Sequence, residues 1–142
     1  MEYKRVMGLD VGDKRIGIAM SDLLMITAQG LETYTRREES EDIAHIASLY
    51  QQNGCSAIVC GLPLNMDGTE GFQAEKVKDF AAKVGQACGT EVIFSDERLT
   101  TVLSEKVLIQ ADMSRQKRRK VIDKVAAVTI LQGYLDSLGN QR

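Results

Sequence analysis

Acidic residues occur at three widely separated positions where a folded α/β protein could bring them together. Asp10 closes an apolar run near the N-terminus, and Asp96 and Glu97 directly follow another apolar run. Asp123 lies in a helical pattern that carries small residues on one side. A carboxylate at such a place is costly to bury unless a cation lies beside it. These positions therefore indicate a divalent metal or phosphate chemistry.

The rest of the composition leaves this chemistry to carboxylates. His45 is the only histidine, and because it lies off the apolar face of its helix we expect it to be exposed to solvent. A single histidine excludes His-based nucleophilic catalysis and His-rich zinc sites. Hard oxygen donors without imidazole match Mg²⁺ or Mn²⁺ held partly by a substrate phosphate. Metal-assisted hydrolysis of a phosphodiester is the reaction that fits best.

The second acidic position offers two candidate ligands. Functional groups in open α/β sheets gather at the carboxyl ends of parallel strands, which is where Asp96 and Glu97 are expected. Either residue could instead begin the following helix. We favour Glu97 as the group that faces the metal, with Asp96 and its neighbour Arg98 in supporting roles.

The third position depends on how its helix packs. Helical spacing aligns Asp123 with Ala127 and Ile130, and these small or apolar residues would let the first turn approach the sheet near Asp10. A carboxylate is also favoured at the N-terminus of a helix. The same dipole disfavours the cations that precede Asp123, which indicates that these cations bind an external anion. We call them the basic segment: Arg115, Lys117, Arg118, Arg119 and Lys120.

Further candidates for nucleic-acid contact lie in two turns. Lys14 and Arg15 follow the Gly-Asp turn after Asp10. Asn65 belongs to the loop 61–70, which is either a phosphate- or base-contacting loop or a plain connection between a strand and a helix. With a net charge of −2, the chain would meet a polyanion through one basic face only.

Length and composition are those of one soluble domain spanning residues 1–142. The chain is 44% hydrophobic and 27% charged, with no apolar run long enough to span a membrane and no signal-peptide pattern. The cysteines lack CxxC spacing, so we expect free thiols in the core of a cytoplasmic protein: Cys55, Cys60 and Cys88.

The order of expected elements predicts a mixed α/β sheet flanked by helices. Hairpin strands are expected at 3–11, 15–21 and 27–35, and parallel strands at 56–60 and 91–95. Helices are expected at 40–52, 70–88, 101–111 and 121–138. Ser40 is the expected cap of the first helix, and Phe72 is expected on the inward face of the second.

Taken in order, these segments resemble the YqgF/RuvX family of the RNase H-like superfamily. The resemblance implies an RNase H-like fold and a metal-dependent nuclease whose acidic residues fall on Asp10, Glu97 and Asp123. The segments that carry it are Gly8-Leu9-Asp10-Val11-Gly12 with Arg15-Ile16-Gly17-Ile18-Ala19, Gly61-Leu62-Pro63 with Asp67-Gly68, Asp96-Glu97-Arg98-Leu99-Thr100-Thr101, and Ile122-Asp123 with Ala126-Ala127.

The resemblance implies two possible substrates, the end of pre-16S ribosomal RNA, with ribosomal precursor particles as partners, and a branched DNA junction. Symmetric cleavage of a four-way junction needs two sites related by a two-fold axis, so it needs a dimer, whereas an RNA end needs one site. No helix shows an obvious dimerisation stripe, which favours ribosomal RNA processing. The monomer and the homodimer, one or two metals, and endo- or exonuclease action stay open.

Two other classes of function compete with the nuclease. An actin-like ATPase or sugar kinase shares a related sheet and an Asp-x-Gly loop such as Asp10 to Gly12. Such enzymes hold nucleotide between two similar domains, and this chain supplies one. A catalytically silent nucleic-acid-binding module is the other alternative, and the presence of Asp10, Glu97 and Asp123 counts against it.

Overall fold

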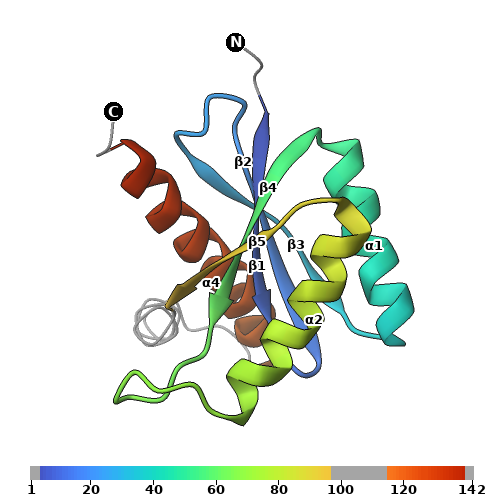
Figure 1. Ribbon diagram of the computed structural model, residues 1–142, viewed down its shortest axis with the longest axis vertical. Coiled ribbons are helices and arrows are strands. Elements are labelled where there is room, and N and C mark those ends of the chain that lie inside the picture. Colours follow the sequence, from blue (N-terminus) through green and yellow to red (C-terminus); the bar gives the residue numbers. More distant parts are fainter. Residues whose placement is uncertain (1–3, 97–114, 140–142) are drawn as a thin grey trace.

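A single mixed sheet organises the protein. The computed structural model describes residues 4–96 and 115–139, with only the backbone described for 115–121. Its strands are β1 (Arg5–Val11), β2 (Arg15–Ser21), β3 (Ala28–Thr35), β4 (Cys55–Leu62) and β5 (Val92–Asp96), in the order β3-β2-β1-β4-β5 (Figure 1). The first three are antiparallel, and β4 and β5 run parallel to β1. The predicted sheet is confirmed, and Asp10 lies on its central strand.

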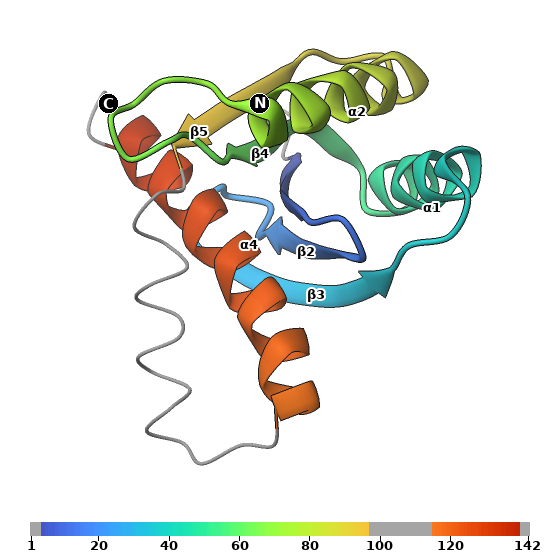
Figure 2. The ribbon, with the colours of Figure 1, turned by 90° about the horizontal axis from the view of Figure 1, so that it is seen from below.

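Helices cover both faces of this sheet (Figure 2). Helices α1 (Glu39–Gln52) and α2 (Phe72–Cys88) pack together on one face, and α4 (Arg115–Gly139) crosses the other. The helix predicted at 101–111 lies outside the described residues. None of the described helices has the length and apolar character that a membrane span requires.

The alternation of side chains along the strands divides the core into two clusters. Met7, Leu9 and Val11 of β1 join the larger cluster under α1 and α2. Val6 belongs to the smaller cluster, which packs against Ala127, Leu131 and other residues of α4. Asp10 follows the parity of Val6, so it belongs to the face that α4 covers.

Small residues on three strands let α4 lie unusually close to the sheet. Gly8, Ala19 and Gly30 are register partners across β1, β2 and β3. A Cβ built on Gly8 would lie 2.7 Å from Cβ of Leu131, and one built on Gly30 would lie 2.4 Å from Cδ of Lys124. Each contact is too short for a real side chain, so the helix occupies the space that the glycines leave.

Several expectations about individual residues are wrong. Helix α1 begins at Glu39 after Glu38, whose side chain makes no capping bond, so Ser40 is not the cap. Phe72 opens α2 and is 75% exposed rather than inward, because the helical face that meets the sheet is formed by residues such as Ala74 and Val77. Strand β5, expected to be buried, ends the described sheet and has half-exposed side chains.

Replacement of Gly17 by alanine tests the close approach of α4. A Cβ on Gly17 would lie 1.9 Å from the carbonyl oxygen of Asp123, a backbone atom that can move only with its helix. We expect Gly17→Ala to lower the free energy of unfolding by at least the roughly 1–3 kcal/mol typical of overpacking. Urea unfolding of the purified variant measures this change.

The matched control is a glycine on α4 that faces open space. A Cβ on Gly133 meets nothing within 4 Å. Gly133→Ala should therefore stabilise the protein by up to about 1 kcal/mol, the helix-propensity difference between the two residues. Equal effects of the two substitutions would contradict the packing that we describe.

Candidate active site

Asp10 and Asp123 converge at Gly17 of β2, where the lack of a side chain lets α4 approach the sheet. Asp10 is the register partner of Gly17 on β2. The backbone of Asp123 lies directly over Gly17, on the face of the sheet to which Asp10 belongs. Two of the predicted acidic residues, 113 positions apart by their numbers, therefore converge at the carboxyl end of the central strand.

Asp123 is held by a cation from the second strand. Nε of Arg15 donates to Oδ2 of Asp123 at 2.7 Å, and the two side chains are only 26% and 21% exposed. We predicted Arg15 as a nucleic-acid contact, which stays a prediction, and the structure shows in addition that it pairs with a candidate metal ligand. Lys14, its neighbour in the turn, is exposed to solvent.

The position of Asp123 within α4 differs from the prediction. The helix begins at Arg115, so Asp123 is two turns inside it rather than at its N-terminus. The helix dipole therefore does not account for the carboxylate, since its effect is confined to the first and last turns. The close packing over Gly17 and the ion pair with Arg15 position Asp123 instead.

The basic segment forms the first turns of the same helix. Residues 115–120 are helical and precede Asp123 without a break. Their side chains lie outside what the structure describes, so the predicted contacts of Arg115, Lys117, Arg118, Arg119 and Lys120 stay predictions. The backbone places these positions and a candidate metal ligand on one continuous helix.

At the end of β5, strand register separates the two acidic candidates. Asp96 is exposed and is the register partner of Leu62, which belongs to the cluster under α1 and α2. Asp96 is therefore on the face opposite to Asp10, away from the convergence of Asp10 and Asp123. Glu97 and Arg98 lie outside the described residues.

The hairpin that carries Asp10 is braced from the other face of the sheet by Arg36. Its Nη1 donates to the carbonyl oxygen of Gly12 at 3.0 Å, and its Nε donates to Oδ2 of Asp42 at 3.0 Å. The guanidinium carbon lies 4.6 Å from the ring centroid of Phe80 on α2. One side chain thus ties the turn after Asp10 to both helices of that face.

Asp42 is the buried anchor of this brace, with no exposed surface. Burial alone would raise the pKa of its carboxyl group. The backbone N–H of Arg37, the guanidinium of Arg36 and the hydroxyl of Tyr34 together outweigh burial and lower that pKa below its usual value. Periodicity gave no signal for this residue, because an acidic residue in the first turn of a helix is ordinarily exposed.

The lowered pKa of Asp42 predicts an acid-sensitive contribution to stability. The ionised carboxylate stabilises the fold above the pKa of about 3.9 in the unfolded chain, and this is lost as pH falls through the lower folded pKa. Asp42→Asn should cost on the order of 3–5 kcal/mol at pH 7, as expected when one partner of a buried pair is removed. Urea unfolding at pH 7 and pH 3 should show a smaller difference from wild type at pH 3.

Glu41→Gln provides the control, because Glu41 is the exposed neighbour of Asp42 in the same turn. It should change stability by no more than about 1 kcal/mol, the scale of a helix-dipole contact. A difference between Asp42→Asn and wild type that is the same at pH 3 and pH 7 would refute the role of the ionised carboxylate.

The histidine and the cysteines lie away from the carboxylates. His45 is half-buried rather than exposed, with Nε2 2.7 Å from Oε1 of Glu32 and its ring stacked on Tyr34 at 4.4 Å. All three cysteines are free, as predicted. Burial raises the pKa of the Cys55 thiol to about 11, so the thiolate required of a metal ligand is scarce at neutral pH.

The loop that contains Asn65 is closed by its own hydrogen bonds. Nδ2 of Asn65 donates to Oγ1 of Thr69 at 3.0 Å, and the hydroxyl of Thr69 donates to Oδ1 of Asp67 at 2.6 Å. The backbone N–H of Asn65 also bonds to the carbonyl of Thr69 at 2.8 Å. Asn65 is exposed but already serves the loop, so its contact with nucleic acid stays a prediction.

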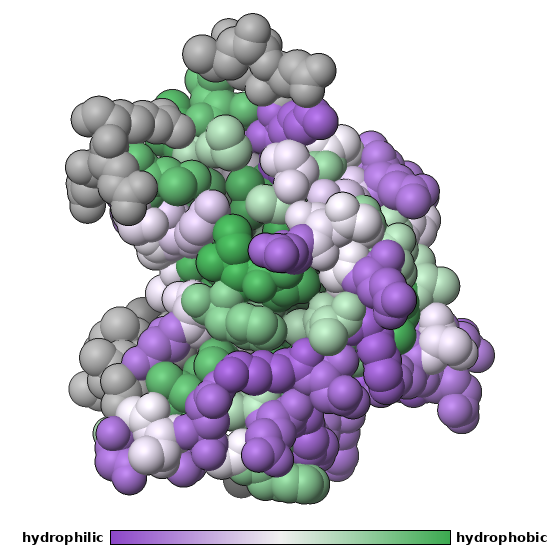
Figure 3. All heavy atoms as spheres, viewed as in Figure 1, coloured by the Kyte–Doolittle hydropathy of each residue, from purple (hydrophilic) through white to green (hydrophobic). Residues whose placement is uncertain are grey.

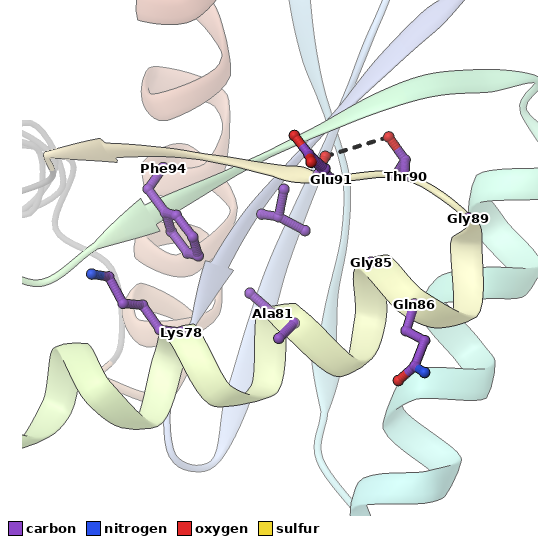
Figure 4. Close-up of a pocket in the computed structure, with 10 residues that line it drawn as sticks. Lys78, Ala81, Gly85, Gln86, Gly89, Thr90, Glu91 and Phe94 are labelled. Carbon is purple, nitrogen blue, oxygen red and sulfur yellow. Dashed lines mark hydrogen bonds between the residues drawn. The ribbon is translucent and has the colours of Figure 1, made fainter.

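One cavity of the described structure lies away from these carboxylates. It has a volume of about 680 Å³ and lies between α2 and β5. Figure 4 shows Lys78 and Phe94 toward one end and Gln86 and Thr90 toward the other, with Ala81 between them. Hydrophobic residues gather over this region in Figure 3. Because it opens on the α2 face, it is separate from Asp10 and Asp123.

Comparison with known proteins places the chain in a family. Residues 4–137 match the model of the RuvX family, described as Holliday junction resolvase. The chain belongs to this family. The sequence resemblance to the YqgF/RuvX group is thereby confirmed.

Similar proteins and structures agree with this assignment. A protein of Clostridium acetobutylicum named "Putative pre-16S rRNA nuclease" is 50% identical over 134 residues, covering 94% of this chain and 99% of that protein. A Clostridioides difficile protein of the same name is 54% identical over 132 residues, covering 93% and 94%. The family and these relatives share the function of a nuclease.

Among solved structures, RuvC of T. thermophilus in complex with a Holliday junction substrate superimposes with a TM-score of 0.62. The identity is 11%, and the match covers 96% of this chain and 97% of that one. At this identity the likeness shows the fold alone. It confirms the predicted RNase H-like architecture.

Proposed function

We propose that this nuclease is metal-dependent and that Asp10, Glu97 and Asp123 hold Mg²⁺ or Mn²⁺ for the hydrolysis of a phosphodiester bond. The observation that carries the proposal is the convergence of Asp10 and Asp123 across Gly17 on one face of the sheet. Glu97 completes the set because the register of β5 assigns Asp96 to the opposite face. Asp96 and Arg98 keep supporting roles in the proposal.

The donor chemistry fits a hard cation. Asp10 and Asp123 supply carboxylate oxygens, and His45 and Cys60 belong to the other face of the sheet. Within the residues that the structure describes, no group of three acidic, histidine or cysteine side chains could hold a metal. A bound Mg²⁺ or Mn²⁺ would activate water and stabilise the leaving oxygen.

Arg15 has a defined part in this proposal. Its guanidinium donates to one oxygen of Asp123. This places a positive charge beside Asp123 at the point where Asp10 also converges. The ion pair reduces the repulsion between the two acids and fixes one of them before a cation binds. We therefore assign Arg15 as a positioning residue as well as a candidate contact for phosphate.

The basic segment at the start of α4 provides the phosphate contacts of the proposal. Cations at positions 115 to 120 precede Asp123 on the same helix. Lysine and arginine bound to phosphates supply affinity without sequence specificity and fix the register of the nucleic acid. Lys14, at the exposed turn after Asp10, extends this contact surface.

The proposed substrate is the end of pre-16S ribosomal RNA. Relatives with about half of their residues identical carry that substrate in their name and match this chain over nearly their whole length. Residues 1–142 would act as one nuclease domain in the cytoplasm, on ribosomal precursor particles. Cleavage of a Holliday junction, which the family description names, is the second candidate and would require a dimer.

Conservative substitutions of the three acids test the metal site. Asp10→Asn, Glu97→Gln and Asp123→Asn should each lower the cleavage rate of a pre-16S RNA end by at least about 100-fold, because each removes a ligand charge that the transition state needs. Cleavage should require Mg²⁺ or Mn²⁺ and stop in EDTA. The measurement uses gel assays of an RNA end and of a four-way DNA junction under the same conditions.

The control is Asp136→Asn, which removes an exposed carboxylate from the same helix as Asp123. It should leave the cleavage rate within about twofold. Cleavage that survives in Asp10→Asn, or that proceeds fully in EDTA, would refute the proposed site. Cleavage of the junction and not of the RNA would select the second candidate substrate.

The basic segment makes a separate prediction about salt. Arg118→Glu with Arg119→Glu should weaken RNA binding and reduce the slope of log K against log salt. The reduction should be about 0.7 for each phosphate of a single strand that the variant no longer neutralises. Fluorescence anisotropy at several salt concentrations measures the slope. An unchanged slope would identify the segment as ordinary surface.

A further inference from the structure

Phe72 is an aromatic side chain in an unusual position. It is 75% exposed at the first turn of α2, whereas Phe80 on the same helix is 3% exposed. The chain contains three phenylalanines, four tyrosines and no tryptophan. An exposed apolar residue alone is common and carries no inference. The inference rests on the charged side chains that surround Phe72.

A cation lies over the ring of Phe72. Nζ of Lys76 is 5.3 Å from the ring centroid and donates to Oδ1 of Asp13 at 3.0 Å. Nε2 of Gln73 donates to the same oxygen at 3.2 Å. These donors lower the pKa of the Asp13 carboxyl group, so it is ionised at neutral pH. The ammonium and the carboxylate form an ion pair at the surface, with the two side chains 45% and 63% exposed.

Asp13 connects this arrangement to the nuclease site. It lies in the turn between β1 and β2, three residues after Asp10, and three residues of chain span at most roughly 10 Å. Helix α2 starts at the same edge of the sheet, where β1 and β4 end (Figure 1). Phe72 is thus next to the turn that follows the central acidic residue.

An aromatic ring with a cation nearby suits a nucleobase attached to a phosphate. Stacking of a base on an aromatic side chain is favourable for every base, because each has a π face. A base inside a duplex has both faces covered by its neighbours, whereas an unpaired base is free to stack. The same ring and cation therefore discriminate between single-stranded and fully paired nucleic acid.

We propose that Phe72 stacks on an unpaired nucleobase of the substrate, with Lys76 beside it for the adjoining phosphate. This inference rests on the proposed nuclease function and narrows its substrate to a strand with a single-stranded segment next to the scissile bond. Phe72 is a binding residue in this proposal and takes no part in the metal chemistry.

Binding without turnover tests the proposal separately from cleavage. In EDTA, anisotropy would compare wild type with Phe72→Leu on a single-stranded RNA 12-mer and on a blunt RNA duplex of equal length. Phe72→Leu should weaken binding of the single strand by about 5- to 150-fold, which corresponds to a stacking energy of about 1–3 kcal/mol. Binding of the duplex should stay within about twofold. The salt slope should be unchanged, because the substitution removes no charge.

Met66→Ala is the matched control, since Met66 is an apolar side chain of the preceding loop and is 80% exposed. It should leave both affinities within about twofold. Because Phe72 is exposed, Phe72→Leu should also melt at the temperature of wild type, which separates a loss of stacking from a loss of folding.

A tryptophan variant gives a direct signal. Phe72→Trp would be the only tryptophan in the chain. Its fluorescence should be quenched by the single-stranded 12-mer and not by the blunt duplex. Undiminished affinity of Phe72→Leu for the single strand, an equal loss on both RNAs, or unquenched fluorescence would each overturn the proposal and leave Phe72 as a surface for a protein.

The two proposals fail in different ways. If Phe72 contributes to single-strand binding but the wild type cleaves neither substrate in Mg²⁺ or Mn²⁺, the nuclease site is refuted and the base contact stands. Cleavage with full affinity in Phe72→Leu would refute the base contact and keep the nuclease site.

Discussion

The contact of the α4 backbone with the β2 backbone is the constraint on which the site depends. The carbonyl oxygen of Asp123 occupies the space that a Cβ would need on Gly17. Helices usually pack on sheets through side chains, which keep the two backbones apart. At Gly17 no side chain lies between the two backbones. Asp123 of α4 therefore approaches the sheet beside Asp10 of the central strand.

On the opposite face of the sheet, a buried ion pair supports the turn that follows Asp10. Arg36 bonds to the carbonyl of Gly12 and to Asp42, so the turn after Asp10 is tied to α1. An unpaired Asp42 carboxylate would be expensive at such burial, and its hydrogen bonds outweigh the effect of burial and lower its pKa. On one face, α4 packs against Gly8 of the strand that bears Asp10. On the other face, the ion pair of Arg36 and Asp42 holds the turn that follows this strand. Such support from outside the site keeps catalytic side chains in fixed geometry.

Much of this arrangement is predictable from periodicity. Apolar runs ending in acids locate the strands and Asp10, and the small residues Ala126 and Ala127 predict a close helix. The strand glycines that receive the helix are harder to recognise, although a glycine within a strand pattern is a known signal of close backbone approach. The strand register places three glycines under α4, and this register cannot be read from local sequence; they are Gly8, Gly17 and Gly30.

Other features have no local signal at all. The partner of Asp42 is Arg36, which is near in sequence, but burial of the pair depends on Phe80 of a later helix. The predicted start of α4 is too late, because cations at a helix N-terminus oppose the helix dipole even though lysine and arginine are good helix formers. The structure extends the helix through them nonetheless. In the proposed function, these charges contact phosphates of the substrate rather than stabilise the helix.

That extension sets the spacing along α4 between the basic segment and Asp123. A helix rises 1.5 Å per residue, so positions 115 to 120 precede Asp123 by roughly 4.5 to 12 Å along one rigid axis. The C-terminal half of the helix is anchored by buried residues such as Ala127 and Leu131, while its first turns run ahead of the carboxylate. A phosphate bound near the start of the helix would be held at a fixed spacing from Asp123. In the proposed function, the helix would therefore set the distance between the cations that contact the nucleic acid and the carboxylate that holds the metal.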